Sequence, residues 1–206
     1  MRIFKCMCWL MGLGMTLLFL QGCRYLAGTH RAFSRSESKQ HFYRNQSGFQ
    51  TLVTDWIAHH SNDDIAYRPW NKDEIRWNGT SILLDGSGYL VQNGAHKGTR
   101  SDSFSSAAQL ADAEPVDLAN WVSSLKKLNV ASLNVIGTKL PISQRYVQID
   151  LQESGADYGY LYVPTGHEEA QAQIIAASSK QPNLIGMDRV EQIAPEWFYF
   201  EGKGAL

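Results

Sequence analysis

Two short turns, each flanked by alternating apolar residues, constrain the fold of this chain more than any other feature of its sequence. The first is Asp85-Gly86-Ser87-Gly88, whose glycines can adopt the positive φ angles that a tight turn requires. The second spans residues 153–157. Strands joined by such short connections pair antiparallel. The sequence therefore predicts two β-hairpins, which pair segment 75–84 with 88–91 and segment 145–152 with 158–163.

Helical periodicity predicts three amphipathic helices among these strands. Ser47 and Gln50 form a capping box at the start of the first helix, Pro115 suits the first turn of the second, and Thr165 with Glu168 opens the third. The apolar stripe of the first helix is Phe49, Leu52, Val53, Trp56 and Ile57, and that of the second is Leu118, Trp121, Val122 and Leu125.

Other segments are less regular. Strands are predicted at 133–136 and 197–201, an aromatic loop at 67–70, and a loose stretch at 93–113 with a short helical piece near Gln109. Because the helices lie between paired strands instead of alternating with single ones, we expect an α+β fold. It should form a single domain of antiparallel hairpins packed with two or three amphipathic helices.

The first 22 residues have the organisation of an export signal. Arg2 and Lys5 are followed by an apolar run from Met7 to Leu20, interrupted only by Thr16. This run of about 14 residues is typical of a secretory signal and shorter than the ~20 residues that a spanning helix needs. The alternative is a short N-terminal membrane anchor that is never cleaved.

Leu20-Gln21-Gly22-Cys23 resembles the lipobox of bacterial lipoprotein precursors. The resemblance implies that residues 1–22 are a signal peptide and that the membrane is reached through lipidation of Cys23. Arg24, and not an aspartate, follows this cysteine, and the sorting rule of the family then implies the outer membrane of a Gram-negative envelope. We accordingly expect a lipid-anchored protein that faces the periplasm.

The cysteine content agrees with this expectation. Cys6 and Cys8 would leave with the signal peptide, and Cys23 would carry the lipid. The mature chain would then hold no thiol for a disulfide, a thiolate nucleophile or a cysteine-ligated metal.

Charge divides the mature chain into two parts. Five basic residues against one acidic residue give residues 23–46 a charge of about +4, and we interpret this part as a basic flexible tether. Residues 47–206 hold about 12 Lys and Arg against about 19 Asp and Glu, near −7, and form the predicted globular domain. An acidic domain disfavours nucleic acid as a partner.

Three motifs are more simply explained by structure than by chemistry. The Asp85–Gly88 turn lacks the first and last carboxylates of a calcium-binding loop. The Ser-x-x-Lys pattern at residues 123–127 lacks its companion catalytic motifs. Adjacent His59 and His60, near Asp63, diverge too far on a helix to share one metal ion. We expect no metal, no cofactor and no complete catalytic site.

A stripe of tyrosines is the most suggestive candidate for a binding surface. Pairing the aliphatic faces of the second hairpin in the core would place four tyrosines on its other face, where large amphipathic rings suit recognition of a protein or an envelope polymer. The alternative is that a helix covers this face. The tyrosines are Tyr146, Tyr158, Tyr160 and Tyr162.

Three functional hypotheses follow. The first is a non-enzymatic envelope lipoprotein that binds a partner. The second is an immunity lipoprotein that neutralises a toxin delivered to the periplasm. The third is an envelope hydrolase whose site combines residues scattered along the chain, with His96, His167, Asp150 and Asp157 as candidates.

Overall fold

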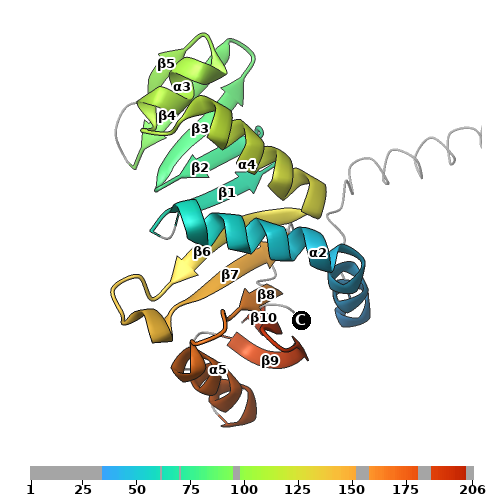
Figure 1. Ribbon diagram of the computed structural model, residues 1–206. Coiled ribbons are helices and arrows are strands. Elements are labelled where there is room, and N and C mark those ends of the chain that lie inside the picture. Colours follow the sequence, from blue (N-terminus) through green and yellow to red (C-terminus); the bar gives the residue numbers. More distant parts are fainter. Residues whose placement is uncertain are drawn as a thin grey trace, which may run out of the picture. The chain divides into compact units, whose positions relative to one another are not determined.

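The computed structural model describes residues 34–60, 62–69, 71–94, 98–151, 158–180 and 187–202. Within these ranges, one antiparallel sheet of ten strands packs against four helices in a single domain, which confirms the predicted α+β fold (Figure 1). The signal peptide, Cys23 and the tether up to residue 33 lie outside the described residues.

The sheet has the strand order β5-β4-β3-β2-β1-β6-β7-β8-β10-β9. Most neighbours are consecutive in the chain, as in a meander, and the step from β5 to β6 carries two helices. The strands are β1 (Asp64–Arg68), β2 (Glu74–Trp77), β3 (Thr80–Asp85), β4 (Gly88–Asn93), β5 (Thr99–Ser101), β6 (Val130–Ile136), β7 (Tyr146–Leu151), β8 (Tyr158–Tyr162), β9 (Met187–Ala194) and β10 (Trp197–Gly202). The helices are α2 (Arg35–His60), α3 (Phe104–Leu110), α4 (Pro115–Leu128) and α5 (Glu168–Lys180), with a 3₁₀ turn η1 (Ile142–Gln144).

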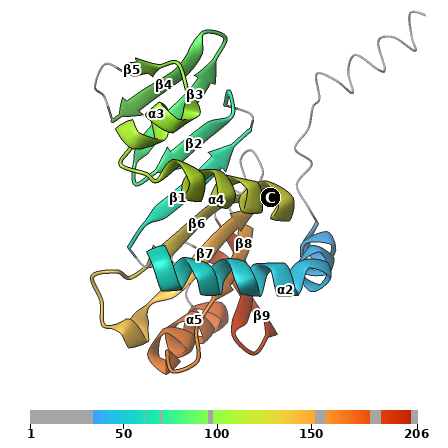
Figure 2. The same cartoon turned by 45° about the horizontal axis from the view of Figure 1, so that its top comes forward.

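Each face of the sheet carries its own apolar core. Helices α2, α3 and α4 bury their apolar residues against one face, and α2 and α4 cross the strands side by side (Figures 1 and 2). Helix α5 packs on the opposite face, near β9. Strand β10 serves both cores because side chains alternate along a strand: Trp197 and Tyr199 face the first, while Phe198 and Phe200 face the second. The strand predicted at residues 197–201 is thereby confirmed.

Helix α2 begins at Arg35, twelve residues before the predicted start at Ser47. Its true N-terminus carries a capping box in which the Glu37 carboxylate accepts from the Ser34 backbone N–H at 2.8 Å and the Ser34 hydroxyl accepts from the Glu37 N–H at 3.4 Å. The assignment of residues 35–46 to a flexible tether is therefore wrong.

The N-terminal half of α2 is helical because it is buried. Phe42 is fully buried between Phe49, Tyr160 and Trp197, with ring centroids 5.1–6.0 Å away. Two ion pairs add to this packing at the first two turns: Arg35 lies 3.1 Å from Glu201 and Lys39 lies 2.6 Å from Glu191. Because ion pairs in contact with water are screened and contribute little, burial of the phenylalanine is the larger effect.

The strand predictions need three corrections. Segment 75–84 is not one strand, because Asn78 and Gly79 adopt positive φ angles of 47° and 78° and separate β2 from β3. The supposed aromatic loop at 67–70 includes the end of β1. Strands β1, β5 and β9 were not predicted. The Asp85–Gly88 turn between β3 and β4 is confirmed, as is α4 with Pro115 in its first turn. The turn at 153–157 lies outside the described residues.

Candidate functional site

The structure does not expose the predicted tyrosine surface. Tyr158, Tyr160 and Tyr162 are 3%, 0% and 7% exposed and belong to the core beneath α2. The Tyr160 hydroxyl donates to the Ser38 carbonyl oxygen at 2.7 Å, and burial raises the pKa of this phenol well above its usual range. The alternative, that a helix covers these rings, is the correct one.

The error arose from the register of the hairpin. Val147 pairs with Tyr162 and Ile149 with Tyr160, so aliphatic and aromatic residues share one face. Tyr146 points to the other face and is buried in the core under α5, where burial raises its pKa to about 12. The four tyrosines therefore never form one stripe.

His60 lies inside a cluster of three tryptophans. Its ring centroid is 4.9 Å from Trp56, 5.3 Å from Trp121 and 5.4 Å from Trp77. Asp63 accepts a hydrogen bond from Nδ1 at 2.9 Å, and Nε2 is 3.0 Å from the indole N–H of Trp121. Because an indole only donates, Nε2 must accept and Nδ1 carries the hydrogen. Both ring nitrogens are therefore occupied.

His60 borders a groove of about 620 Å³ between α2 and α4, which is also lined by Ser124. The arrangement does not support hydrolysis, since Nε2 of His60 is not available as a base and the Ser124 hydroxyl donates to the Asn120 carbonyl oxygen at 3.0 Å. His59 bonds the Asp55 carbonyl oxygen of its own helix. Throughout the described part of the chain, no three His, Cys, Asp or Glu side chains gather as a metal site would require.

The other hydrolase candidates are not brought together either. His167 lies in the turn before α5, where its Nδ1 donates to the Arg145 carbonyl oxygen at 2.7 Å. Asp150 lies on β7, five residues from Arg145 and thus roughly 17 Å along the strand, and it accepts from Ser132 and Gln148. His96 and Asp157 lie outside the described residues.

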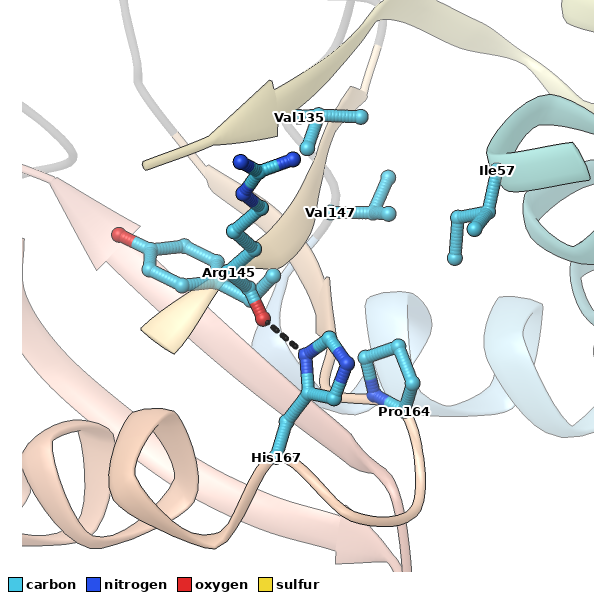
Figure 3. Close-up of a pocket in the computed structure, with 7 residues that line it drawn as sticks. Ile57, Val135, Arg145, Val147, Pro164 and His167 are labelled. Carbon is cyan, nitrogen blue, oxygen red and sulfur yellow. Dashed lines mark hydrogen bonds between the residues drawn. The ribbon is translucent and has the colours of Figure 1, made fainter. Parts of the chain in front are cut away.

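The best candidate for a binding site is an apolar pocket of about 230 Å³, the Arg145 pocket, where α2, β6, β7 and the turn before α5 meet. Figure 3 shows Ile57 of α2 opposite the start of β7, with His167 and Pro164 closing one side. Sequence reasoning missed it because these residues are far apart in the chain and carry no shared motif. Its lining residues are Ile57, Val135, Arg145, Tyr146, Val147, Pro164 and His167.

The polar groups of the pocket are positioned by backbone contacts. Arg145 donates from Nε to the Leu140 carbonyl oxygen at 3.0 Å, which fixes the side chain near Val135 (Figure 3). His167 uses Nδ1 on the Arg145 carbonyl, so Nε2 is the acceptor of the neutral ring. No carboxylate, serine or threonine hydroxyl, or thiol lines the pocket among the residues that the structure describes. The walls are mainly apolar, and the Arg145 guanidinium and the His167 imidazole are their polar groups.

Within the described ranges, no helix combines the length and apolar character needed to cross a bilayer. Comparison with protein-family models, with curated protein sequences and with solved structures found no match to this chain.

Proposed function

We propose that this chain is a lipid-anchored envelope lipoprotein whose folded domain binds a protein partner by accepting one of its side chains in the Arg145 pocket. The lipobox at Leu20–Cys23 supports the anchor, and the composition of the pocket supports binding without catalysis. The observation that carries the proposal is the combination of apolar walls with the Arg145 guanidinium, in a described lining that offers no carboxylate, serine, threonine or cysteine to act with His167.

The size of the pocket favours a partner side chain over a free small molecule. Its volume of about 230 Å³ is below the ~300–1,000 Å³ usual for small-molecule sites. Protein interfaces concentrate their binding energy in a few anchors that fill such pockets. A carboxylate of the partner next to this anchor would pair with Arg145, because guanidinium and carboxylate form strong two-point hydrogen bonds.

Photo-cross-linking in intact cells tests this proposal. A photo-reactive phenylalanine replaces Leu140, which is 46% exposed and whose carbonyl oxygen holds Arg145. Ile175 on α5, 45% exposed, is the matched control position. We expect a discrete cross-linked protein from position 140 and not from position 175, and we expect its loss when Arg145→Glu is added. Cross-links that persist with Arg145→Glu, or that are the same at both positions, would contradict the pocket as the binding site.

The anchor is tested separately by incorporation of labelled palmitate. The natural chain should incorporate label and sediment with membranes, whereas Cys23→Ser should do neither. A Cys23→Ser chain that is still processed and still membrane-bound would refute the lipoprotein assignment, whatever the cross-linking shows. If the cross-linked protein is a toxin, the immunity hypothesis becomes the specific form of this function.

A further inference from the structure

A third cavity, of about 390 Å³, lies between α4 and strands β1–β4 and shares no lining residue with the Arg145 pocket. Helix α4 contributes one stripe to it, from Ala119, Val122, Ser123 and Lys126 at i, i+3, i+4 and i+7. Figure 2 shows that α3 and α4 lie against one face of these strands. We propose that this groove binds a neutral saccharide.

Aromatic rings from three elements form the apolar part of the groove. Tyr67 of β1, Tyr89 of β4 and Phe104 of α3 line it, and the last two meet edge to face with centroids 5.9 Å apart. Tyr89 and Phe104 are only partly buried. Flat rings with accessible surface can pack against the C–H face of a sugar ring, which is the apolar side of an otherwise polar molecule.

Two groups of opposite charge flank the Tyr67 ring. The Lys126 ammonium lies 4.5 Å from its centroid, and Asp73 accepts a hydrogen bond from its hydroxyl at 2.5 Å. Burial, followed by the neighbouring Asp73, raises the pKa of Tyr67 to about 12, so the phenol is neutral at physiological pH. The groove thus offers hydrogen-bond donors on Lys126 and acceptors on Asp73, and the charges of these two groups cancel.

The turn that carries Asp73 is unusual. Lys72 and Asp73 both adopt positive φ angles, 54° and 51°, in a region that residues other than glycine seldom occupy. The carbonyl oxygen of Lys72 accepts from the Leu84 N–H at 3.2 Å, which ties the turn to β3. The chain therefore keeps Asp73 beside Tyr67 in a backbone conformation that costs energy, as is common at binding sites.

These features together select the ligand class. An anion would meet the Asp73 carboxylate, a cation would meet the Lys126 ammonium, and a hydrocarbon chain would cover both charged groups without offering either a hydrogen bond. A neutral sugar offers hydroxyls that donate and accept in turn, plus an apolar face for the rings. The volume lies within the ~300–1,000 Å³ range of small-ligand sites.

The experiment is calorimetric titration of the full-length protein, purified in detergent, with three neutral tetrasaccharides: maltotetraose, cellotetraose and chitotetraose. Lys126→Gln and Tyr89→Ala remove one polar and one aromatic contact of the groove. Lys127→Gln, next to Lys126, and Tyr43→Ala, an exposed tyrosine of α2, are the matched controls. Far-UV circular dichroism and the melting temperature verify that each variant is folded.

We expect at least one tetrasaccharide to bind, with about tenfold or greater loss of affinity, ~1.4 kcal/mol, in Lys126→Gln and in Tyr89→Ala and none in the controls. Absence of binding for all three sugars at millimolar concentration would overturn the proposal. So would binding that Lys126→Gln and Tyr89→Ala leave unchanged in folded protein. Because the Arg145 pocket is untouched by these variants, either result is independent of the partner-binding proposal.

Discussion

Replacing Phe42 with alanine tests whether residues 35–46 belong to the folded domain. In the structure, this ring is fully buried among Phe49, Tyr160 and Trp197. In a flexible tether, the same ring would be in water and its removal would cost nothing. Phe42→Ala therefore separates the two descriptions of this segment more directly than any other single change.

The expected cost follows from the burial. Truncating a fully buried phenylalanine to alanine destabilises a domain by ~3–5 kcal/mol, since transfer energy is lost and a cavity remains. For a domain of 150–250 residues, each kcal/mol lowers the melting temperature by roughly 2–4 °C. We therefore expect the melting temperature of Phe42→Ala to fall by about 6–20 °C.

Urea unfolding followed by tryptophan fluorescence measures the effect, in a soluble form of the protein that begins at residue 24. Trp197 contacts Phe42 and reports on this part of the core. Tyr43→Ala is the control, because the neighbouring ring is 55% exposed and should change the free energy of unfolding by ~0.5–1 kcal/mol at most. If Phe42→Ala unfolds at the same urea concentration as Tyr43→Ala, the assignment of residues 35–46 to the folded core is wrong.

Two further predictions concern the same core. Burial, opposed by a backbone contact to Leu128, lowers the pKa of His41 below its usual 6.5. Protons then bind His41 more readily in the unfolded chain than in the folded one, so we expect the free energy of unfolding to fall as the pH drops below 6.5. This fall should be smaller in His41→Gln than in His59→Gln. Gly159→Ala would place a Cβ atom 1.9 Å from the Ile149 carbonyl oxygen, so we expect a loss of ~2 kcal/mol or more in urea unfolding. Gly86→Ala, with nothing within 4 Å of its Cβ, should have little effect, and equal stabilities of the two variants would contradict the β7–β8 pairing.

Elements with strong local signals could be predicted from the sequence. Helix α4 has a proline in its first turn, an apolar stripe and lysines in its last turn, and its predicted position is confirmed. The Asp85–Gly88 turn is likewise determined locally, because Gly88 adopts the positive φ angle that the turn requires. In both cases, residues next to one another in the chain determine the structure.

Elements stabilised by distant residues could not be predicted in this way. The first turns of α2 have few apolar residues, and they are helical because Phe42 fits among rings from β8 and β10. Half of the residues of strand β9 are polar, its apolar residues do not alternate regularly with them, and it lies at the edge of the sheet, where charged side chains are common. The Arg145 pocket combines α2, β6, β7 and the turn before α5, and no local pattern joins them.

The tyrosine error shows how much depends on register. A shift of one residue in strand pairing moves every side chain to the other face of the sheet. We assumed that aliphatic residues pair with aliphatic residues, whereas Val147 lies opposite Tyr162. The hydroxyl groups do not prevent burial, because Ser38 and Gln50 of α2 provide hydrogen-bond partners to Tyr160 and Tyr162. The helix that was assigned in part to the tether is the element that buries the supposed binding surface.

The early start of α2 also limits where a lipid-anchored domain could act. If Cys23 carries lipid, as proposed, only about 11 residues separate it from the helix that begins at Arg35. A chain of that length spans at most ~40 Å when fully extended and has a root-mean-square reach of ~18 Å when flexible. A tether that ended at residue 46 would extend about twice as far. The Arg145 pocket and the groove beside Lys126 would therefore meet partners or glycans close to the membrane that holds the anchor, and not those deep in the periplasm.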